Sequence, residues 1–223
     1  MILQYTMPLF FTHNISPKHK VSLWEMTETI DQLMRMIVLS HEDENALALI
    51  THEHRKKQWL STRILLNELT GKNSRIVYDE FGKPSVEKTS IHISLSHSHD
   101  LIAMVIDSKR TGVDIELIKS KIQNIASKFM SGLELLSVLN QNRETAFPEN
   151  RIEQLYVYWC AKEALYKLYG KKQLFFKENI IIHPFKYRIQ GEITGEIITK
   201  SFHKKYKLHY EKINGYMMVY VLS

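Results

Sequence analysis

Two short segments in the second half of the chain constrain its fold more than any other part of the sequence. Residues 113–117 alternate apolar and acidic side chains, which predicts a strand with Asp114 and Glu116 on the same side. Residues 157–168 repeat small and aliphatic side chains at helical spacing, which predicts a helix with one apolar stripe. Glu163 and Lys167 lie one turn apart on the opposite side of that helix.

Three carboxylates beside ammonium groups indicate metal-assisted chemistry at a phosphate. Mg²⁺ prefers oxygen ligands and shares its coordination shell with substrate phosphates. We therefore expect Asp114, Glu116 and Glu163 to surround a divalent cation, with Lys162 and Lys167 close to phosphate oxygens. Without the strand and helix together, the same residues would be an ordinary helix-surface ion pair and the solvated face of a strand.

Charge and cysteine content limit the class of protein. The chain has 223 residues, a net charge of +6 and a single cysteine, Cys160. One cysteine excludes an internal disulfide and is typical of a reducing, cytoplasmic compartment. No apolar run is long enough to cross a bilayer, and residues 1–11 lack the charged start of a signal peptide. The positive charge favours an anionic partner, which could be a nucleotide, a nucleic acid or an acidic protein.

The order of the predicted elements favours an α+β fold, because strands and helices are mixed without βαβ alternation. We expect two pseudo-symmetric halves, 1–108 and 109–223, each a small antiparallel sheet packed with a long helix. The long helices are predicted at 45–71 and 152–169, each ending at a glycine. The other predicted elements are helices near 122–130 and 133–139, strands at 75–78, 91–95 and 101–106, and a hairpin of 206–213 and 216–222 with an Asn-Gly turn.

The two opening segments resemble the signature of 4′-phosphopantetheinyl transferases of the surfactin-synthetase-activating, two-half type. The first reads Gly-Val-Asp-Ile-Glu at 112–116, and the second reads Trp-Cys-Ala-Lys-Glu-Ala-Leu-Tyr-Lys at 159–167. Three upstream elements agree in order: a helix containing Arg55 and Arg63, then Gly82-Lys83-Pro84, then Ser96-His97-Ser98. The resemblance spans roughly residues 50–185.

The sequence departs from the family pattern on both sides of Ser96-His97-Ser98. The family often has Phe-Asn where this chain has Ile93-Ser94, and a glycine where it has His99.

The resemblance implies transfer of the phosphopantetheine arm of coenzyme A to a serine of an apo acyl, peptidyl or aryl carrier protein, which leaves 3′,5′-ADP. It implies Mg²⁺, with Mn²⁺ as an alternative, held by Asp114, Glu116 and Glu163. Glu163 is then the candidate base, and Lys167 and His97 hold phosphate oxygens. The residues expected to bind coenzyme A are Arg55, Lys83, Ser96, His97, Lys162 and Lys167, with Lys56 and Arg63 as alternatives to Arg55. Because these come from both halves, the active site is expected in the cleft between them.

The implied partner is an acidic carrier protein of fatty acid, polyketide or nonribosomal peptide synthesis, with neither nucleic acid nor membrane involved. We expect a cytoplasmic monomer whose surplus positive charge steers the carrier. The expected docking surface is 122–136, with the nearby Lys121 and Lys128.

Two other functions use the same residues. A metal-dependent phosphoesterase or nuclease could use the same carboxylates, and it predicts a broad basic groove with stacking aromatic residues. A non-enzymatic basic binding protein on a transferase scaffold predicts that loss of Asp114 is harmless.

Overall fold

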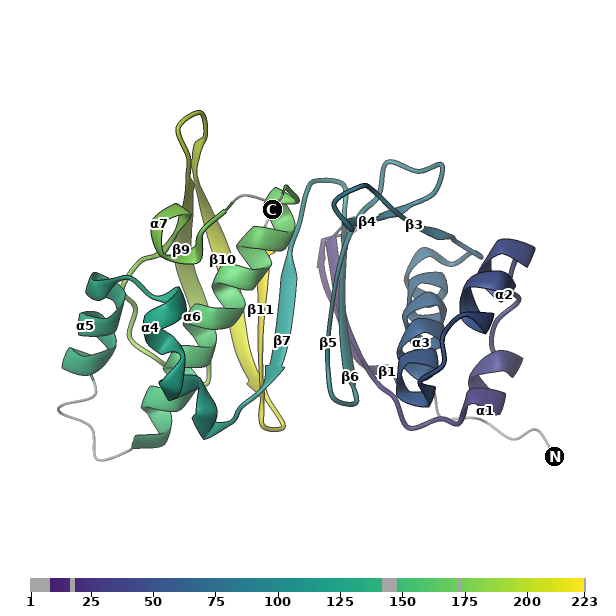
Figure 1. Ribbon diagram of the computed structural model, residues 1–223, viewed down its shortest axis with the longest axis horizontal. Coiled ribbons are helices and arrows are strands. Elements are labelled where there is room, and N and C mark those ends of the chain that lie inside the picture. Colours follow the sequence, from purple (N-terminus) through teal and green to yellow (C-terminus); the bar gives the residue numbers. More distant parts are fainter. Residues whose placement is uncertain (1–8, 17–18, 142–147, 172–173, 223) are drawn as a thin grey trace.

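The computed structural model has four layers, with two antiparallel sheets packed face to face between two groups of helices (Figure 1). It describes residues 9–16, 19–141, 148–171 and 174–222, the side chains of 9–10, 141 and 148–149 excepted. This arrangement confirms the predicted α+β class and the two halves with antiparallel sheets.

The first half is a sheet covered on one face by helices. Its strand order is β1-β2-β6-β5-β4-β3. The strands are β1 (Leu9–Ser16), β2 (His19–Glu25), β3 (Ile76–Tyr78), β4 (Pro84–Val86), β5 (His92–Ser98) and β6 (Leu101–Asp107). The helices are α1 (Ile30–Arg35), α2 (His41–Ala48) and α3 (Glu53–Thr70). The core between α3 and this sheet includes Leu60, Leu65, Trp24 and Met104.

The second half repeats this plan with more helices. Its strand order is β7-β11-β10-β9-β8. The strands are β7 (Val113–Leu117), β8 (Ile180–Ile182), β9 (Gln190–Ile198), β10 (His203–Ile213) and β11 (Tyr216–Leu222). The helical elements are the 3-10 turn η1 (Ser120–Asn124), α4 (Ala126–Phe129), α5 (Gly132–Gln141), α6 (Pro148–Tyr169) and α7 (Phe176–Asn179). The predicted apolar stripe of α6 is buried, including Val157, Ala161 and Leu165.

The inner faces of the two sheets form a third core. Val21, Leu23 and Ala103 of the first sheet lie in one buried cluster with Ile115 and Met218 of the second. The contact between sheets is therefore apolar and holds the two halves in a defined arrangement. Every described helix is either too short or too polar to cross a membrane.

Local turn chemistry explains the hairpin that the sequence predicted. Asn214 and Gly215 both have positive φ, 45° and 83°, as the tight two-residue turn between β10 and β11 requires. Two predicted strands are longer in the structure: β10 begins three residues earlier, at His203, and β5 continues three residues beyond its predicted end, to Ser98. The strands β1, β2, β4, β8 and β9 had no separate predicted counterpart.

Two helix predictions are wrong in detail. The single helix predicted at 45–71 is two helices, α2 and α3, because His52 is extended (φ −77°, ψ 124°) and starts a new helix. Leu49 fits the helical pattern but is 84% exposed, so no packing supports a continuous helix there. The helix predicted at 122–130 is likewise divided, into η1 and the short α4, at Ile125.

Candidate active site

The two sheets meet where β5 lies against β7, and serines of β5 satisfy the backbone of β7. β7 is an edge strand, bonded to β11 on one side only. Ser94 Oγ accepts a hydrogen bond from the Val113 N–H at 3.0 Å, and Ser98 Oγ accepts one from the Leu117 N–H at 3.1 Å. Alternation along β5 therefore presents serine hydroxyls to the N–H groups that an edge strand leaves unpaired.

Asp114 is the most constrained carboxylate of the site. It is buried, and its Oδ1 accepts hydrogen bonds from Ser96 Oγ and from Lys167 Nζ, both at 2.7 Å. Lys167 Nζ also donates to the Val113 carbonyl at 3.1 Å. The second carboxylate oxygen, Oδ2, is buried without a hydrogen-bond partner among the described residues. One acceptor atom is thus left facing into the protein with its bonding capacity unused.

The other two carboxylates are destabilised by their surroundings. Burial, reinforced by the charge of Asp114, raises the pKa of Glu116, while hydrogen bonds from Ser98 and Trp159 oppose the shift. Burial and then Asp114 raise the pKa of Glu163 to about 7, against the opposing charge of Lys167. Glu116 adds to this effect on Glu163, so the three carboxylates repel one another.

Close backbone packing sets the distance between β7 and α6. A Cβ atom at Gly112 would lie 1.9 Å from the carbonyl oxygen of Ala164, so only glycine fits at the start of this strand. The strand carrying Asp114 and the helix carrying Glu163 are therefore in direct backbone contact.

A cavity of about 580 Å³ lies between the halves beside this cluster. It is lined by residues of α3, the turn between β3 and β4, β5 and the end of α6. Five of the predicted coenzyme A-binding residues line it: Arg55, Lys83, Ser96, His97 and Lys167. Ser96 and Lys167 also contact Asp114, so they join the cavity to the carboxylates.

Lys83 connects the two halves at the cavity wall. Its Nζ donates to the Leu168 carbonyl at 2.9 Å, at the end of α6. Burial, with a smaller contribution from Arg110, lowers the pKa of Lys83. The ammonium therefore caps a helix C-terminus as well as adding positive charge to the cavity.

Lys162 is not brought to this cavity. Its side chain is fully buried, and Nζ donates to the carbonyls of Phe176 and Ile180 at 2.8 and 2.7 Å. It also pairs with Glu134 at 2.9 Å, and Glu134 in turn accepts from the Ile182 N–H. This network ties α5, α6 and α7 to β8, and all of the described contacts of Lys162 are structural.

The cavity also contains aromatic residues that the sequence did not indicate, and Arg63, which the sequence left as an alternative to Arg55. Trp59, Tyr78 and Phe81 line it, as does Arg63. The Arg63 guanidinium lies 3.2 Å from the centre of the Trp59 ring and 3.2 Å from Asp43 Oδ1. Helical spacing of Arg55, Trp59 and Arg63 was the available signal, since i, i+4 and i+8 share one face.

The donor set fits a hard divalent cation, although the described side chains do not form a ready chelate. Three carboxylates provide oxygen ligands, and the unpartnered Asp114 Oδ2 is a free acceptor. Among the described residues no three histidine, cysteine, aspartate or glutamate side chains are grouped closely enough to hold a metal. Cation binding would therefore require Asp114, Glu116 and Glu163 to draw closer, and it would relieve their mutual repulsion.

The part of the chain that carries Asp114, Glu116 and Glu163 matches a known protein family. A family model described as "4'-phosphopantetheinyl transferase superfamily" matches residues 110–221. The chain is 32% identical over 120 residues to the 4′-phosphopantetheinyl transferase AcpT of Salmonella typhi, which covers 52% of this chain and 60% of the relative. It is 39% identical over 92 residues to psf-1 of Bacillus pumilus (40% and 37%) and 29% identical over 154 residues to Sfp of Bacillus subtilis strain 168 (68% and 64%). The matches thus span between about a third and two thirds of these relatives.

Proposed function

The chain belongs to the 4′-phosphopantetheinyl transferase superfamily, and from this premise we propose that it transfers the phosphopantetheine arm of coenzyme A to a serine of an apo carrier protein. The serine oxygen forms a bond to the phosphorus that carries pantetheine. The bond from that phosphorus to the bridging oxygen breaks, and 3′,5′-ADP leaves with the bridging oxygen. The observation that carries the proposal is the contact of buried Asp114 with Ser96 and Lys167, two residues of the cavity wall.

We assign the metal-holding role to Asp114, Glu116 and Glu163. A bound Mg²⁺ would neutralise the negative charge of the coenzyme A pyrophosphate. Such neutralisation is the main requirement of phosphoryl-type transfer. Burial, followed by repulsion from Asp114, raises the pKa of Glu116 and Glu163, and this supports the role, since a dication would stabilise their charged forms.

The residues of the chain position the substrate and move the proton. Lys167 and His97 line the cavity and would donate to phosphate oxygens, and Arg55 and Lys83 would seat the nucleotide. Glu163 would accept the serine proton, directly or through a water molecule. A bound dication would stabilise the charged form of Glu163, and the charged carboxylate is the form that accepts a proton.

The carrier protein would dock on the outer face of η1, α4 and α5. Ile125, Leu133 and Leu136 are exposed there, by 36, 80 and 53%, and Lys121 and Lys128 are exposed nearby. An apolar patch with basic neighbours suits a partner that presents apolar residues within an acidic surface. We expect association to slow as salt is raised, because screening weakens the steering.

The transfer reaction is tested by the mass of the carrier. The protein is incubated with coenzyme A, Mg²⁺ and an apo carrier protein, and the carrier is weighed. We expect a gain of one phosphopantetheine arm, lost in Asp114→Ala and kept in Asp31→Ala, a control on the exposed face of α1. Cleavage of coenzyme A without modification of the carrier would favour a phosphoesterase. Binding of the carrier or of coenzyme A without formation of any product would favour a non-enzymatic role.

The docking surface is tested by a matched pair of leucines. Leu133 and Leu49 are 80 and 84% exposed on opposite halves. We expect Leu133→Glu to raise the KM for the carrier at saturating coenzyme A, because it places a like charge against an acidic partner. Leu49→Glu should leave that KM unchanged, and an equal effect of both substitutions would exclude this surface.

A further inference from the structure

A second cavity, of about 910 Å³, lies in the second half of the protein. Its walls come from the segment between β6 and β7, the last turn of α6, the loop before β10, the start of β10 and the end of β11. Leu168 and Tyr169 line this cavity, whereas Tyr166, Lys167 and Gly170 line the cavity between the halves. At 100° per residue these two sets lie on different sides of the α6 axis, so the last turn of α6 separates the cavities.

The second cavity, here called the basic basin, is lined by several cations and, among the residues that the structure describes, by no carboxylate. Its basic residues are Lys109, Arg110, Lys171, Lys204, Lys205 and Lys207. Lys205 pairs with Glu196 at 3.2 Å. The other five form no ion pair with the part of the chain that the structure describes. Several unneutralised cations around one hollow repel one another and concentrate anions there.

The aromatic residues of the basic basin are walls rather than open stacking surfaces. Tyr169 and Phe202 contact each other with ring centres 5.8 Å apart, and both pack against the main core of this half. The Lys204 ammonium lies 5.0 Å from the centre of the Tyr206 ring. Single-stranded nucleic acid is held by bases stacked on free aromatic faces, whereas the rings described here already contact each other, the core or a lysine.

We propose that the basic basin binds a compact compound carrying two or more phosphate groups, at a site separate from the cavity between the halves. A volume of about 910 Å³ falls in the range of small-molecule sites, about 300–1,000 Å³. A polyphosphate places several negative charges within that volume, which matches cations that converge from three segments of the chain. This binding does not depend on the transfer reaction, and its test needs no turnover.

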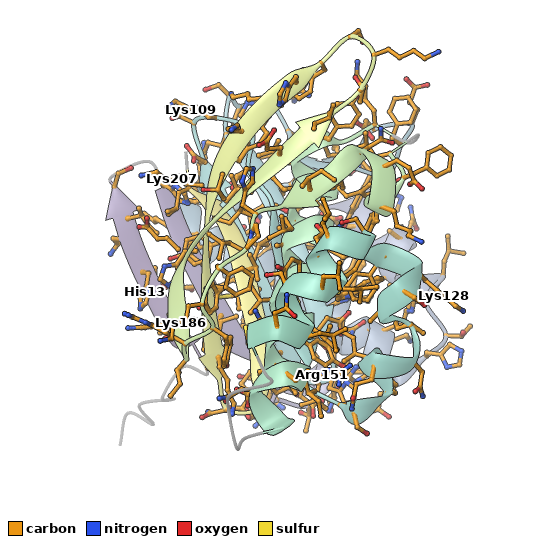
Figure 2. All side chains as sticks on the ribbon, turned by 90° about the vertical axis from the view of Figure 1, so that its left-hand side faces the viewer. His13, Lys109, Lys128, Arg151, Lys186 and Lys207 are labelled. Carbon is orange, nitrogen blue, oxygen red and sulfur yellow. The ribbon has the colours of Figure 1, made fainter. Side chains whose placement is uncertain are left out.

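Two charge-reversed variants with equal net charge test the proposal. Lys204→Glu/Lys207→Glu alters the basic basin, and Lys128→Glu/Lys186→Glu alters surface positions elsewhere. Figure 2 shows Lys207 beside Lys109 in the upper part of the molecule, Lys186 well below them and Lys128 at the opposite edge. Lys171 is left unchanged because it lines both cavities.

Inorganic tripolyphosphate is titrated calorimetrically into the protein at a coenzyme A concentration that saturates the cavity between the halves. We expect one tripolyphosphate site in the wild type, with a Kd raised at least about tenfold in the basin variant and less than about twofold in the control. Circular dichroism and the retained affinity for coenzyme A show that each variant is folded. An absence of wild-type binding at millimolar tripolyphosphate, or an equal loss in both variants, would overturn the proposal.

A competition experiment identifies the source of the phosphate groups. If adenosine 3′,5′-bisphosphate displaces tripolyphosphate from the coenzyme A-saturated protein, the basin accepts phosphate esters of nucleosides. If it does not, the basin selects linked phosphates, and the proposal stands for these alone. If tripolyphosphate binds without coenzyme A and this binding is lost at saturating coenzyme A, the binding lies in the other cavity and a separate site is refuted.

Discussion

Replacing Glu163 by glutamine should make the protein more stable and less active. Glutamine keeps the size of the side chain and mimics its neutral form, while it removes the charge that the site disfavours. Burial and the charge of Asp114 raise the pKa of Glu163 to about 7, from an ordinary value of 4.5. The folded protein therefore resists an ionisation that the unfolded chain undergoes freely.

The sign and size of the effect follow from this difference in pKa. Below pH 4.5 the carboxyl is neutral in both states and costs no stability. As the pH rises from 4.5 to about 7, the unfolded state ionises first and the free energy of unfolding falls. The loss is about 1 kcal/mol at pH 5 and about 3 kcal/mol at pH 8, at 1.36 kcal/mol per pKa unit. Glu163→Gln should restore these amounts.

Urea denaturation in the presence of a chelator measures this effect at pH 5 and pH 8. Glu68→Gln, an exposed position on α3, is the control and should change stability by less than about 0.5 kcal/mol at either pH. Added Mg²⁺ should then stabilise the wild type more than Glu163→Gln, because the charged ligand is gone from the variant. Turnover in the carrier assay should fall at least about a hundredfold, while coenzyme A still binds.

Two results would refute the reasoning. If Glu163→Gln is no more stable than the wild type at pH 8, the carboxylates do not destabilise the metal-free site. If its turnover is near normal, Glu163 is neither a metal ligand nor the base.

Lys162→Met should lower stability by about 3–5 kcal/mol, because it leaves the Glu134 carboxylate buried without its partner. A thermal scan should show this as a fall in Tm of roughly 6–20 °C. Lys167→Ala should instead weaken coenzyme A binding and turnover, as measured by calorimetry and the carrier assay, with a smaller change in Tm. Gly112→Ala should cost about 3 kcal/mol in urea denaturation because its Cβ would overlap a carbonyl oxygen, whereas Gly132→Ala, with open space around it, should change stability by under about 1 kcal/mol. Hydrogen bonds, chiefly from His203, lower the pKa of Glu196 to about 2, so Glu196→Gln should be less stable than the wild type above pH 4.5, and their urea midpoints should converge as the pH falls toward 2.

Local patterns predicted the elements whose conformation depends on near neighbours in the sequence. The Asn214-Gly215 turn and the alternation at 113–117 both needed only a few adjacent residues, and both are present in the structure. The prediction of a single helix at 45–71 was wrong because packing, which a local pattern does not contain, decides where such a helix continues. Leu49 continues the apolar period, but a helix of this kind is stabilised by packing, and at Leu49 there is none.

The sequence alone determined the order of the motifs, the family resemblance and the side of the strand or helix on which each carboxylate lies. These depend on covalent spacing and on the fixed periods of strands and helices. Only the tertiary structure decided that Lys162 is buried against Glu134 while Lys167, a little over one turn along the same helix, contacts Asp114. It also decided that serines of β5 meet the edge of β7. Burial and contact are set by segments distant in the chain, whose positions a periodic pattern does not contain, and burial in turn sets the pKa of Glu163 on which the proposed chemistry depends.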